Sequence, residues 1–130
     1  MRILLIEDNP GDALLVQSYL EEVDVSIELE NVTSLAAASQ RLEGTPTQGA
    51  KFDALLVDLS LPDAQGLETV QRTQSLGLPF VVMTGLGDEA TALAAVQAGA
   101  QDYLVKGRAS GADIRRALCY AVERTRLNRE

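Results

Sequence analysis

The sequence predicts an α/β fold in which one parallel sheet of five strands is covered by five helices. Four short runs rich in Val, Ile and Leu are typical of strands buried on both faces of a parallel sheet; they cover residues 3–6, 55–57, 80–83 and 103–105. Segments with helical spacing lie between these runs, and such alternation implies right-handed crossovers. At 130 residues the chain has the size of one domain, so residues 1–130 are expected to form a single unit.

The first strand, at 3–6, is expected to lead into a helix. Asn9 suits the cap position, and Pro10 suits the first helical position because its missing N–H is not needed there. The apolar residues that follow recur at helical spacing and are expected to face the core: Leu15, Val16, Tyr19, Leu20 and Val23.

The second strand is expected at the edge of the sheet. Val25, Ile27 and Leu29 alternate with polar residues, the period-two pattern of a half-exposed strand. A short alanine-rich helix follows over 34–42, and residues 44–49 are interpreted as a polar linker.

Three more helices are expected in the second half of the chain. The third follows Asp63 and includes Leu67, Val70 and Gln71. The fourth is capped by Asp88 and ends at Gly99, and two residues are expected on its inner face: Leu93 and Val96. The last helix, about residues 111–130, can continue into a linker, and its expected core positions are Ile114, Leu118 and Val122.

Each of the four buried runs stops at a reactive polar group. The first ends at Glu7 and Asp8, the second at Asp58, the third at Thr84 and the fourth at Lys106. A flavodoxin-like strand order, 2-1-3-4-5, places the first and third strands side by side at the topological switch point. Because ligand sites in such sheets form beyond the carboxyl ends of the strands, we expect these five side chains at one rim.

Three carboxylates at one rim call for a cation, since two of them about 4 Å apart repel by about 4 kcal/mol at an effective dielectric near 20. The chain has no histidine, and oxygen ligands select a hard cation, with Mg²⁺ the default at a phosphate site. Asp58 is the natural nucleophile, because a carboxylate can carry a phosphoryl group as an acyl phosphate. Lys106 supplies a positive charge and Thr84 a hydrogen-bond donor for that group.

Composition narrows the classes of partner. The formal charge of −8 disfavours direct nucleic-acid binding, which needs clustered Lys and Arg. No apolar stretch approaches the roughly 18 residues of a membrane span, and no signal-peptide pattern is present. Cys119 is the one cysteine, so no internal disulfide can form, which is consistent with a cytoplasmic location.

Four motifs in this order resemble those of a response-regulator receiver domain, over essentially the whole chain; they lie at residues 5–9 (LIEDN), 56–66 (LVDLSLPDAQG), 82–85 (VMTG) and 98–106 (AGAQDYLVK). The resemblance implies that Asp58 accepts a phosphoryl group from a phosphohistidine on a sensor histidine kinase or phosphotransfer protein. It also implies Mg²⁺ ligands and phosphoryl-binding residues: Glu7, Asp8, Asp58 and the backbone carbonyl of Ser60 for the metal, and Thr84 and Lys106 for the phosphoryl oxygens.

The same resemblance implies a switch and an output surface. Tyr103 matches the aromatic residue that turns inward when Thr84 moves, and the alternative is a half-buried aromatic on an edge strand without that role. The output surface implied is the fourth helix, fifth strand and fifth helix. The effector is a partner protein or an output domain outside this chain, and formation of a homodimer is left open.

The chain departs from the family pattern at two places. Gly107 follows the lysine where the family usually has a proline in a cis peptide, and glycine can bend there without a cis bond. Ser60 and Leu86 fall at positions that influence hydrolysis of the acyl phosphate in the family. Because leucine offers no hydrogen bond to an attacking water, we expect a comparatively long-lived phosphorylated state.

Two other functions compete with the signalling switch. Haloacid-dehalogenase-type Mg²⁺ phosphatases also use a strand-end Asp, a Thr and a Lys, but they carry a second Asp two residues after the nucleophile, where this chain has Ser60. A degenerate receiver that acts only as a binding module usually lacks the acidic pair, the Asp or the Lys, and here all are present. The prediction is therefore a signalling receiver rather than a dedicated enzyme.

Overall fold

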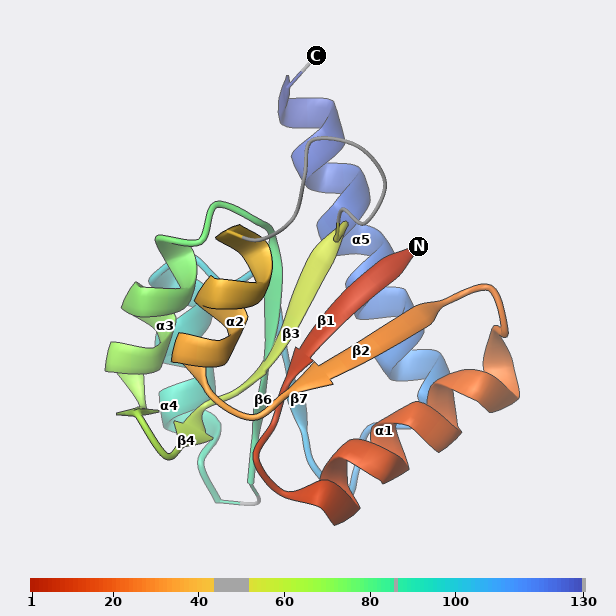
Figure 1. The fold of residues 1–130 in the computed structure, drawn as a ribbon, viewed down its shortest axis with the longest axis horizontal. Coiled ribbons are helices and arrows are strands. Elements are labelled where there is room, and N and C mark those ends of the chain that lie inside the picture. The colour runs from red at the N-terminus through yellow and green to blue at the C-terminus, as the bar shows by residue number, and fades with distance from the viewer. Residues whose placement is uncertain (44–51, 86, 130) are drawn as a thin grey trace.

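The computed structural model describes residues 1–43, 52–85 and 87–129. Within these ranges, five strands form one parallel sheet in the order β2-β1-β3-β6-β7 (Figure 1). Their bounds are Arg2–Ile6 for β1, Glu28–Val32 for β2, Ala54–Asp58 for β3, Phe80–Thr84 for β6 and Asp102–Val105 for β7. This is the predicted order 2-1-3-4-5, because β4 and β5 belong to a separate small hairpin.

In the described part of the chain five helices cover the sheet, and they divide between its two faces as Figure 1 shows. Their bounds are Pro10–Val23 for α1, Leu35–Glu43 for α2, Leu67–Gln74 for α3, Glu89–Gln97 for α4 and Gly111–Arg129 for α5. One core cluster joins the sheet to α2, α3 and α4, and the other joins it to α1 and α5. Every residue of β3 and β6 is buried, as expected for central strands covered on both faces.

The register of the central strands aligns their carboxyl ends. Ile6 of β1 pairs with Val57 of β3, and Asp58 of β3 pairs with Met83 of β6. Glu7, one residue beyond Ile6, is therefore level with Asp58, and Thr84 ends the neighbouring strand. The rim predicted from the sequence exists because these three strands stop together.

A two-stranded hairpin that the sequence did not predict follows β3. Its strands are β4, Ser60–Leu61, and β5, Ala64–Gln65. In its turn, Asp63 accepts hydrogen bonds from the first N–H groups of α2, at 3.1 Å from Leu35 and 3.0 Å from Ala36. The Thr69 hydroxyl of α3 donates to the carbonyl of Leu59 at 3.1 Å. The segment after Asp58 is thus fixed by two helices.

The predicted second strand was wrong in its start, because β2 begins at Glu28 rather than at Val25. The Asp24 carboxylate accepts hydrogen bonds from the backbone N–H and the hydroxyl of Ser26, which stabilises a turn at the end of α1. Val25 lies in that turn and is 87% exposed.

Two predicted helix faces were also wrong in part. In α1 the buried residues are Ala13, Val16 and Leu20, whereas three of the predicted core residues lie on a flank that is only partly covered: Leu15, Tyr19 and Val23. In α4, Leu93 is exposed and the inner face consists of Ala92 and Ala95. Small residues let α4 approach the sheet closely, so the larger apolar side chain faces outward.

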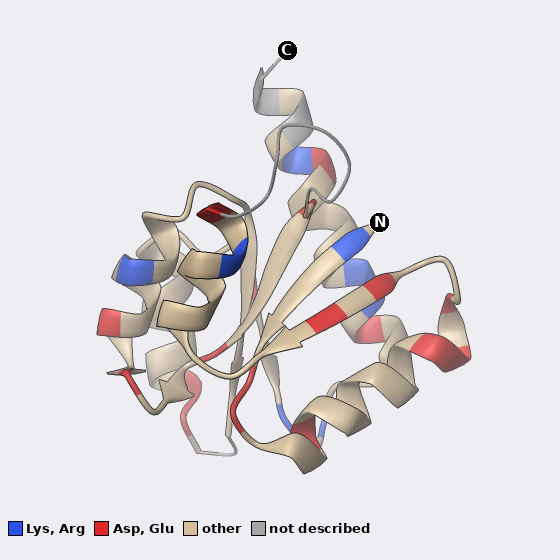
Figure 2. Ribbon diagram, in the orientation of Figure 1, with Lys and Arg blue, Asp and Glu red and all other residues tan. Residues whose placement is uncertain are grey.

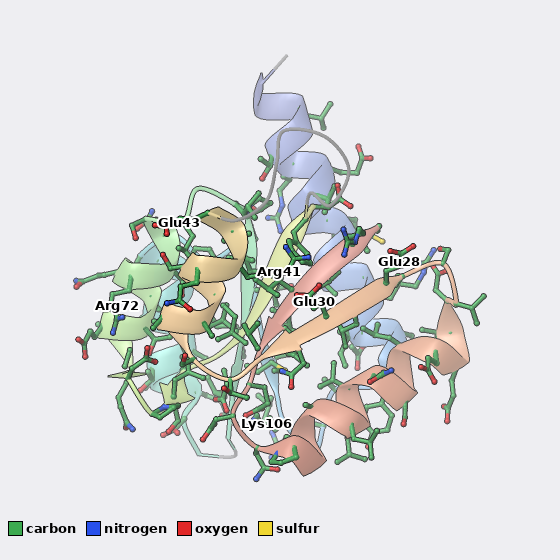
Figure 3. The ribbon with its side chains drawn as sticks, viewed as in Figure 1. Glu28, Glu30, Arg41, Glu43, Arg72 and Lys106 are labelled. Carbon is green, nitrogen blue, oxygen red and sulfur yellow. The ribbon has the colours of Figure 1, made fainter. Side chains whose placement is uncertain are left out.

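The edge of the sheet away from the rim contains a cation–π and ion-pair cluster, in which Figure 3 labels Glu30 and Arg41. The guanidinium groups of Arg2 and Arg41 lie 4.9 and 5.1 Å from the ring centroid of Phe52, and Arg41 pairs with Glu30. This cluster ties β1 and β2 to α2.

No helix among the described residues combines the length and apolarity that crossing a bilayer requires. The predicted linker at 44–49 lies outside the described residues.

Candidate functional site

Three carboxylates converge at the rim. Glu7 follows β1, Asp8 comes next and Asp58 ends β3, and one oxygen from each lies within 4.8 Å of the others. Glu7 and Asp58 are buried, whereas Asp8 is exposed. Figure 2 shows acidic segments gathered at this lower end of the sheet, around the segment after β1 and the start of α1. The site therefore has two buried carboxylates and one that is open to solvent.

Lys106 is the cation within this cluster. Its ammonium nitrogen Nζ lies 2.6 Å from Glu7 Oε1, 2.7 Å from Asp58 Oδ2 and 2.9 Å from Asp12 Oδ2. Figure 3 shows Lys106 at the lower end of the sheet near the first turn of α1. It follows β7 directly, and its backbone N–H donates to the carbonyl of Thr84 at 2.8 Å, which fixes its position against β6.

The Asp58 carboxylate is held at both oxygens. Oδ1 accepts a hydrogen bond from the backbone N–H of Ser60 at 3.0 Å, and Oδ2 contacts the Lys106 ammonium. Both partners are donors, so they orient the carboxylate. A carboxylate oriented at the carboxyl end of a strand can act as a nucleophile toward phosphorus.

Burial and neighbouring charges at the rim shift the pKa values of two side chains, Glu7 and Lys106. The pKa of Glu7 is raised from 4.5 to about 7, first because burial disfavours its charge and second because of the neighbouring Asp58; Lys106 and the N–H of Asn9 oppose the shift. For Lys106, burial acts to lower the pKa, but its contacts with Asp58, Glu7 and Asp12 outweigh burial and the pKa is raised. Lys106 stays protonated, and the rim still holds more negative charge than one lysine can neutralise.

Thr84 and Tyr103 lie on the strands beside the acidic cluster. The Thr84 side chain is buried, and its hydroxyl has no hydrogen-bond partner among the described residues. A buried hydroxyl without a partner costs free energy unless a ligand accepts a hydrogen bond from it. Tyr103, in β7, is half-buried and packs against the core cluster on the α4 side of the sheet.

Of the remaining predicted positions, the structure describes Ser60 and Gly107 but not Leu86. Ser60 is exposed in β4, and its N–H, rather than its side chain, contacts Asp58. Gly107 has φ +86°, a backbone conformation that favours glycine, and the described peptide bonds are all trans. Leu86 lies outside the described residues.

The sequence reasoning missed one member of the cluster, Asp12. It is the third residue of α1, and its backbone N–H donates to the Oδ1 of the helix cap Asn9 at 3.0 Å. The Asn9 N–H in turn donates to Glu7 Oε2 at 3.2 Å. The available signal was the cap itself: a helix that is capped by Asn9 and begins at Pro10 has its first turn near the same rim as Glu7.

The donor set fits a hard divalent cation. Glu7, Asp8 and Asp58 offer oxygen ligands only, and they converge around a site where burial penalises uncompensated negative charge. Mg²⁺ binds through one or two carboxylates together with water and phosphate oxygens, and the exposed position of Asp8 leaves room for both.

Comparison with known proteins agrees with this geometry. The sequence matches the family described as response regulator receiver domain over residues 3–118. It is 35% identical over 108 residues to response regulator RppA of Synechocystis, covering 82% of this chain and 44% of RppA. It is 31% identical over 107 residues to transcriptional regulatory protein ResD of Bacillus subtilis, covering 81% of this chain and 41% of ResD. The chain thus spans less than half the length of these relatives.

Solved structures share the fold. A response regulator receiver domain protein from Clostridium thermocellum superposes with a TM-score of 0.77 at 23% identity, covering 97% of both chains. The receiver domain of sensor histidine kinase PA1611 from Pseudomonas aeruginosa, described with magnesium coordinated in its active-site cleft, superposes with a TM-score of 0.71 at 25% identity, covering 94% of this chain and 97% of that one. With the sheet order, the acidic rim and the match over residues 3–118 agreeing, the chain belongs to the response regulator receiver domain family of two-component signalling.

Proposed function

We propose that this receiver domain is a phosphorylation-dependent switch in which Asp58 accepts a phosphoryl group from a phosphohistidine on a sensor histidine kinase or phosphotransfer protein. The observation that carries the proposal is the Asp58 carboxylate, buried at a strand end with Lys106 2.7 Å away and two further carboxylates within 4.8 Å. Thr84 supplies a buried hydroxyl with no partner among the described residues.

In the transfer, a carboxylate oxygen of Asp58 forms a P–O bond while the P–N bond of phosphohistidine breaks and the imidazole leaves with the electron pair. The Ser60 N–H and the Lys106 ammonium orient the carboxylate for in-line attack. Lys106 then neutralises charge on the transferred phosphoryl oxygens, and Thr84 donates a hydrogen bond to one of them.

Magnesium would be held by Glu7, Asp8, Asp58 and the backbone carbonyl of Ser60, and when bound it neutralises charge on the phosphoryl group during transfer. Support for this set is the convergence of the three carboxylates. The Ser60 carbonyl joins the set through the family resemblance.

The switch follows from the new charge. Converting a mostly inactive population to a mostly active one takes roughly 5.5 kcal/mol of differential stabilisation, and a dianion bound by Lys106 and Thr84 in one state is a sufficient source. Movement of Thr84 would let Tyr103 turn inward and change the surface formed by α4, β7 and α5. A downstream effector or an output domain would bind that surface, and a homodimer is the alternative to a monomer that the notion of an output surface leaves open.

The location that fits this function is the cytoplasm, where a sensor kinase presents its phosphohistidine. Residues 1–130 would then act as one receiver unit, with the end of α5 leading toward its output. The family assignment gives no support to the haloacid-dehalogenase alternative. The exposed Ser60 also could not act as the general acid of such a phosphatase.

The test is phosphorylation by acetyl phosphate with Mg²⁺, read by intact mass. We expect addition of one phosphoryl group to the wild type and none to Asp58→Ala. Asp53→Ala is the matched control, because Asp53 is exposed just before the other end of the same strand. Phosphate on Asp58→Ala at the normal rate would remove the claim, and turnover of many phosphoesters would favour the enzyme. An unmodified wild type would favour the binding module.

Lys106→Ala is expected to permit some phosphorylation without full signalling. The carboxylate nucleophile remains in this variant, but the phosphoryl group loses the cation that stabilises the switched state. Beryllofluoride with Mg²⁺, followed by NMR, should shift resonances of α4, β7 and α5 in the wild type and markedly fewer in Lys106→Ala. Equal shifts in both proteins would contradict this role of the lysine.

The lifetime of the phosphorylated form is proposed to be long, on account of Ser60 and Leu86 at the positions that tune hydrolysis. Loss of phosphate with time, followed by intact mass after removal of acetyl phosphate, measures it. A half-life of seconds would count against the proposal.

A further inference from the structure

Lys106 contacts three carboxylates, and one of them stands apart from the other two. Glu7 and Asp58 belong to the group whose oxygens lie within 4.8 Å of one another, whereas that group does not include Asp12. Asp12 instead comes from the first turn of α1, 2.9 Å from the Lys106 ammonium. The lysine is thus shared between carboxylates that a metal would use and one that it would not.

We propose that Asp12 is a positioning residue for Lys106: it holds the ammonium beside the site while magnesium occupies Glu7 and Asp58, and thereby favours metal binding. This inference rests on the proposed function, because it assumes that these carboxylates bind magnesium. It adds a residue whose contribution acts through Lys106 and not through contact with the metal.

The first step of the argument is that Asp12 is held in place. Asn9 caps α1 through the Asp12 N–H, and Pro10 starts the helix with a fixed backbone angle. Ala13 and Val16 bury the inner face of the same turn against the core. The Asp12 carboxylate therefore projects from a fixed backbone, with the Asn9 N–H linking that turn to Glu7 at 3.2 Å.

The second step is competition. The Lys106 ammonium lies 2.6 Å from Glu7 Oε1 and 2.7 Å from Asp58 Oδ2, so a metal that bound these two oxygens would displace it. With Asp12 present, the displaced lysine keeps a carboxylate partner. Without Asp12, the Lys106 ammonium would either lie beside the metal with no carboxylate partner and repel it, or stay on Glu7 and Asp58 and compete with it. Both outcomes weaken metal binding.

The third step is the environment of the pair. Asp12 and Lys106 line a small pocket of about 80 Å³ whose other lining residues include Val16, Met83 and Leu104. Apolar walls reduce the screening of a charge pair on that side. The Asp12 side chain is 40% exposed on its other side, so the contact contributes modestly and not as a fully buried pair would.

The experiment measures Mg²⁺ affinity by isothermal titration calorimetry of the metal-free protein in four forms: wild type, Asp12→Asn, Lys106→Gln and the double variant. Asp12→Asn keeps the shape of the side chain and the backbone cap. We expect its Mg²⁺ dissociation constant to rise about fivefold to tenfold, which is about 1.0–1.4 kcal/mol at 1.4 kcal/mol per decade. In the Lys106→Gln background the same substitution should change the constant by less than about twofold.

Two further variants separate positioning from general effects. Asp12→Glu restores a carboxylate and should return the affinity to within about twofold of wild type. Glu21→Gln makes the same change of charge nine residues along α1, about 14 Å away at 1.5 Å per residue, and should leave the affinity unchanged. Far-UV circular dichroism checks that each variant is folded.

Each outcome decides the matter. If Asp12→Asn lost as much affinity in the Lys106→Gln background as in the wild type, Asp12 would act on the metal by long-range charge, and the proposal would be overturned. A wild-type constant in Asp12→Asn would overturn it as well. Absence of Mg²⁺ binding by the wild type would instead refute the proposed function, and the inference with it.

Discussion

Asp63 offers the sharpest test of how the segment after Asp58 is held. It lies five positions after Asp58, in the turn of the β4–β5 hairpin, yet its carboxylate caps a helix from another part of the chain. The first two N–H groups of α2 lie 3.1 and 3.0 Å from its two oxygens. We predict that Asp63→Ala destabilises the protein by loss of this cap.

The magnitude follows from the geometry. Removal of a helix cap costs about 0.5–2 kcal/mol, typically about 1, and loss of a negative charge at a helix N-terminus adds about 0.3–1 kcal/mol. Because both oxygens are used and the side chain is 29% exposed, we expect about 1.5 kcal/mol, or a Tm lower by about 5 °C for a domain of this size. Asp63→Asn keeps one acceptor but no charge and should lose about half as much.

The dependence on pH supplies a second measurement. Burial acts to raise the pKa of Asp63, but the N–H groups of Ala36 and Leu35 outweigh it, and the pKa lies below the ordinary 3.8. A carboxyl whose folded pKa is lowered stabilises the fold above its unfolded pKa, and this contribution disappears as the pH falls through the folded pKa. The gap between wild type and Asp63→Ala should therefore narrow in acid.

Urea unfolding followed by circular dichroism measures these differences, since the chain has no tryptophan. Asp88→Ala is the matched control: Asp88 precedes α4 at the cap position, but its side chain makes no cap hydrogen bond. We expect it to cost less than about 0.5 kcal/mol. If Asp63→Ala were no more harmful than Asp88→Ala, the assignment of Asp63 as the cap of α2 would be refuted.

Two further predictions concern the packing of α5 and the acidic rim. Gly111→Ala would place a Cβ 2.2 Å from the backbone carbonyl oxygen of Tyr19, so α1 and α5 must separate. We expect the free energy of unfolding, measured with urea, to fall by about 1–3 kcal/mol. Any gain in stability would contradict this close contact between the two helices. For Glu7, the folded pKa of about 7 lies above the ordinary 4.5, so the folded metal-free protein binds more protons than the unfolded chain between these values. The stability due to this shift is full below pH 4.5 and lost as the pH rises through about 7, so Glu7→Gln should flatten the pH profile in this window. Identical profiles for the two proteins would show that Glu7 titrates normally.

The main features of the fold and site could be predicted from the sequence, because buried parallel strands leave a clear signal. Each central strand is a run of apolar residues that ends at a polar residue. The choice of strand order therefore predicted that these polar residues lie together at one rim of the sheet. Glu7, Asp58 and Thr84 lie where that argument placed them, as the registers of β1, β3 and β6 show. Periodicity on helices was less reliable: Leu93 fits a helical core pattern, but alanines occupy the inner face of α4.

The features that escaped prediction depend on contacts between distant parts of the chain. The β4–β5 hairpin has strands of only two residues, too short for any periodic pattern. Asp63 caps a helix that begins 28 positions earlier in the sequence, and Asp12 meets a lysine 94 positions later. In isolation each reads as an ordinary turn or first-turn acid, so only the packed structure reveals its partner.

These long-range contacts connect the stability of the domain to its chemistry. A lysine among four acids, namely Glu7, Asp8, Asp12 and Asp58, leaves the rim with excess negative charge, and the neighbouring Asp58 adds to burial in raising the pKa of Glu7. In the proposed function, a divalent cation relieves that excess, while Asp12 and the Asp63 cap hold Lys106 and the segment after Asp58. A phosphoryl group on Asp58 would then add charge among side chains that are already held in place. Thr84, whose buried hydroxyl has no partner among the described residues, is the group that we expect to respond.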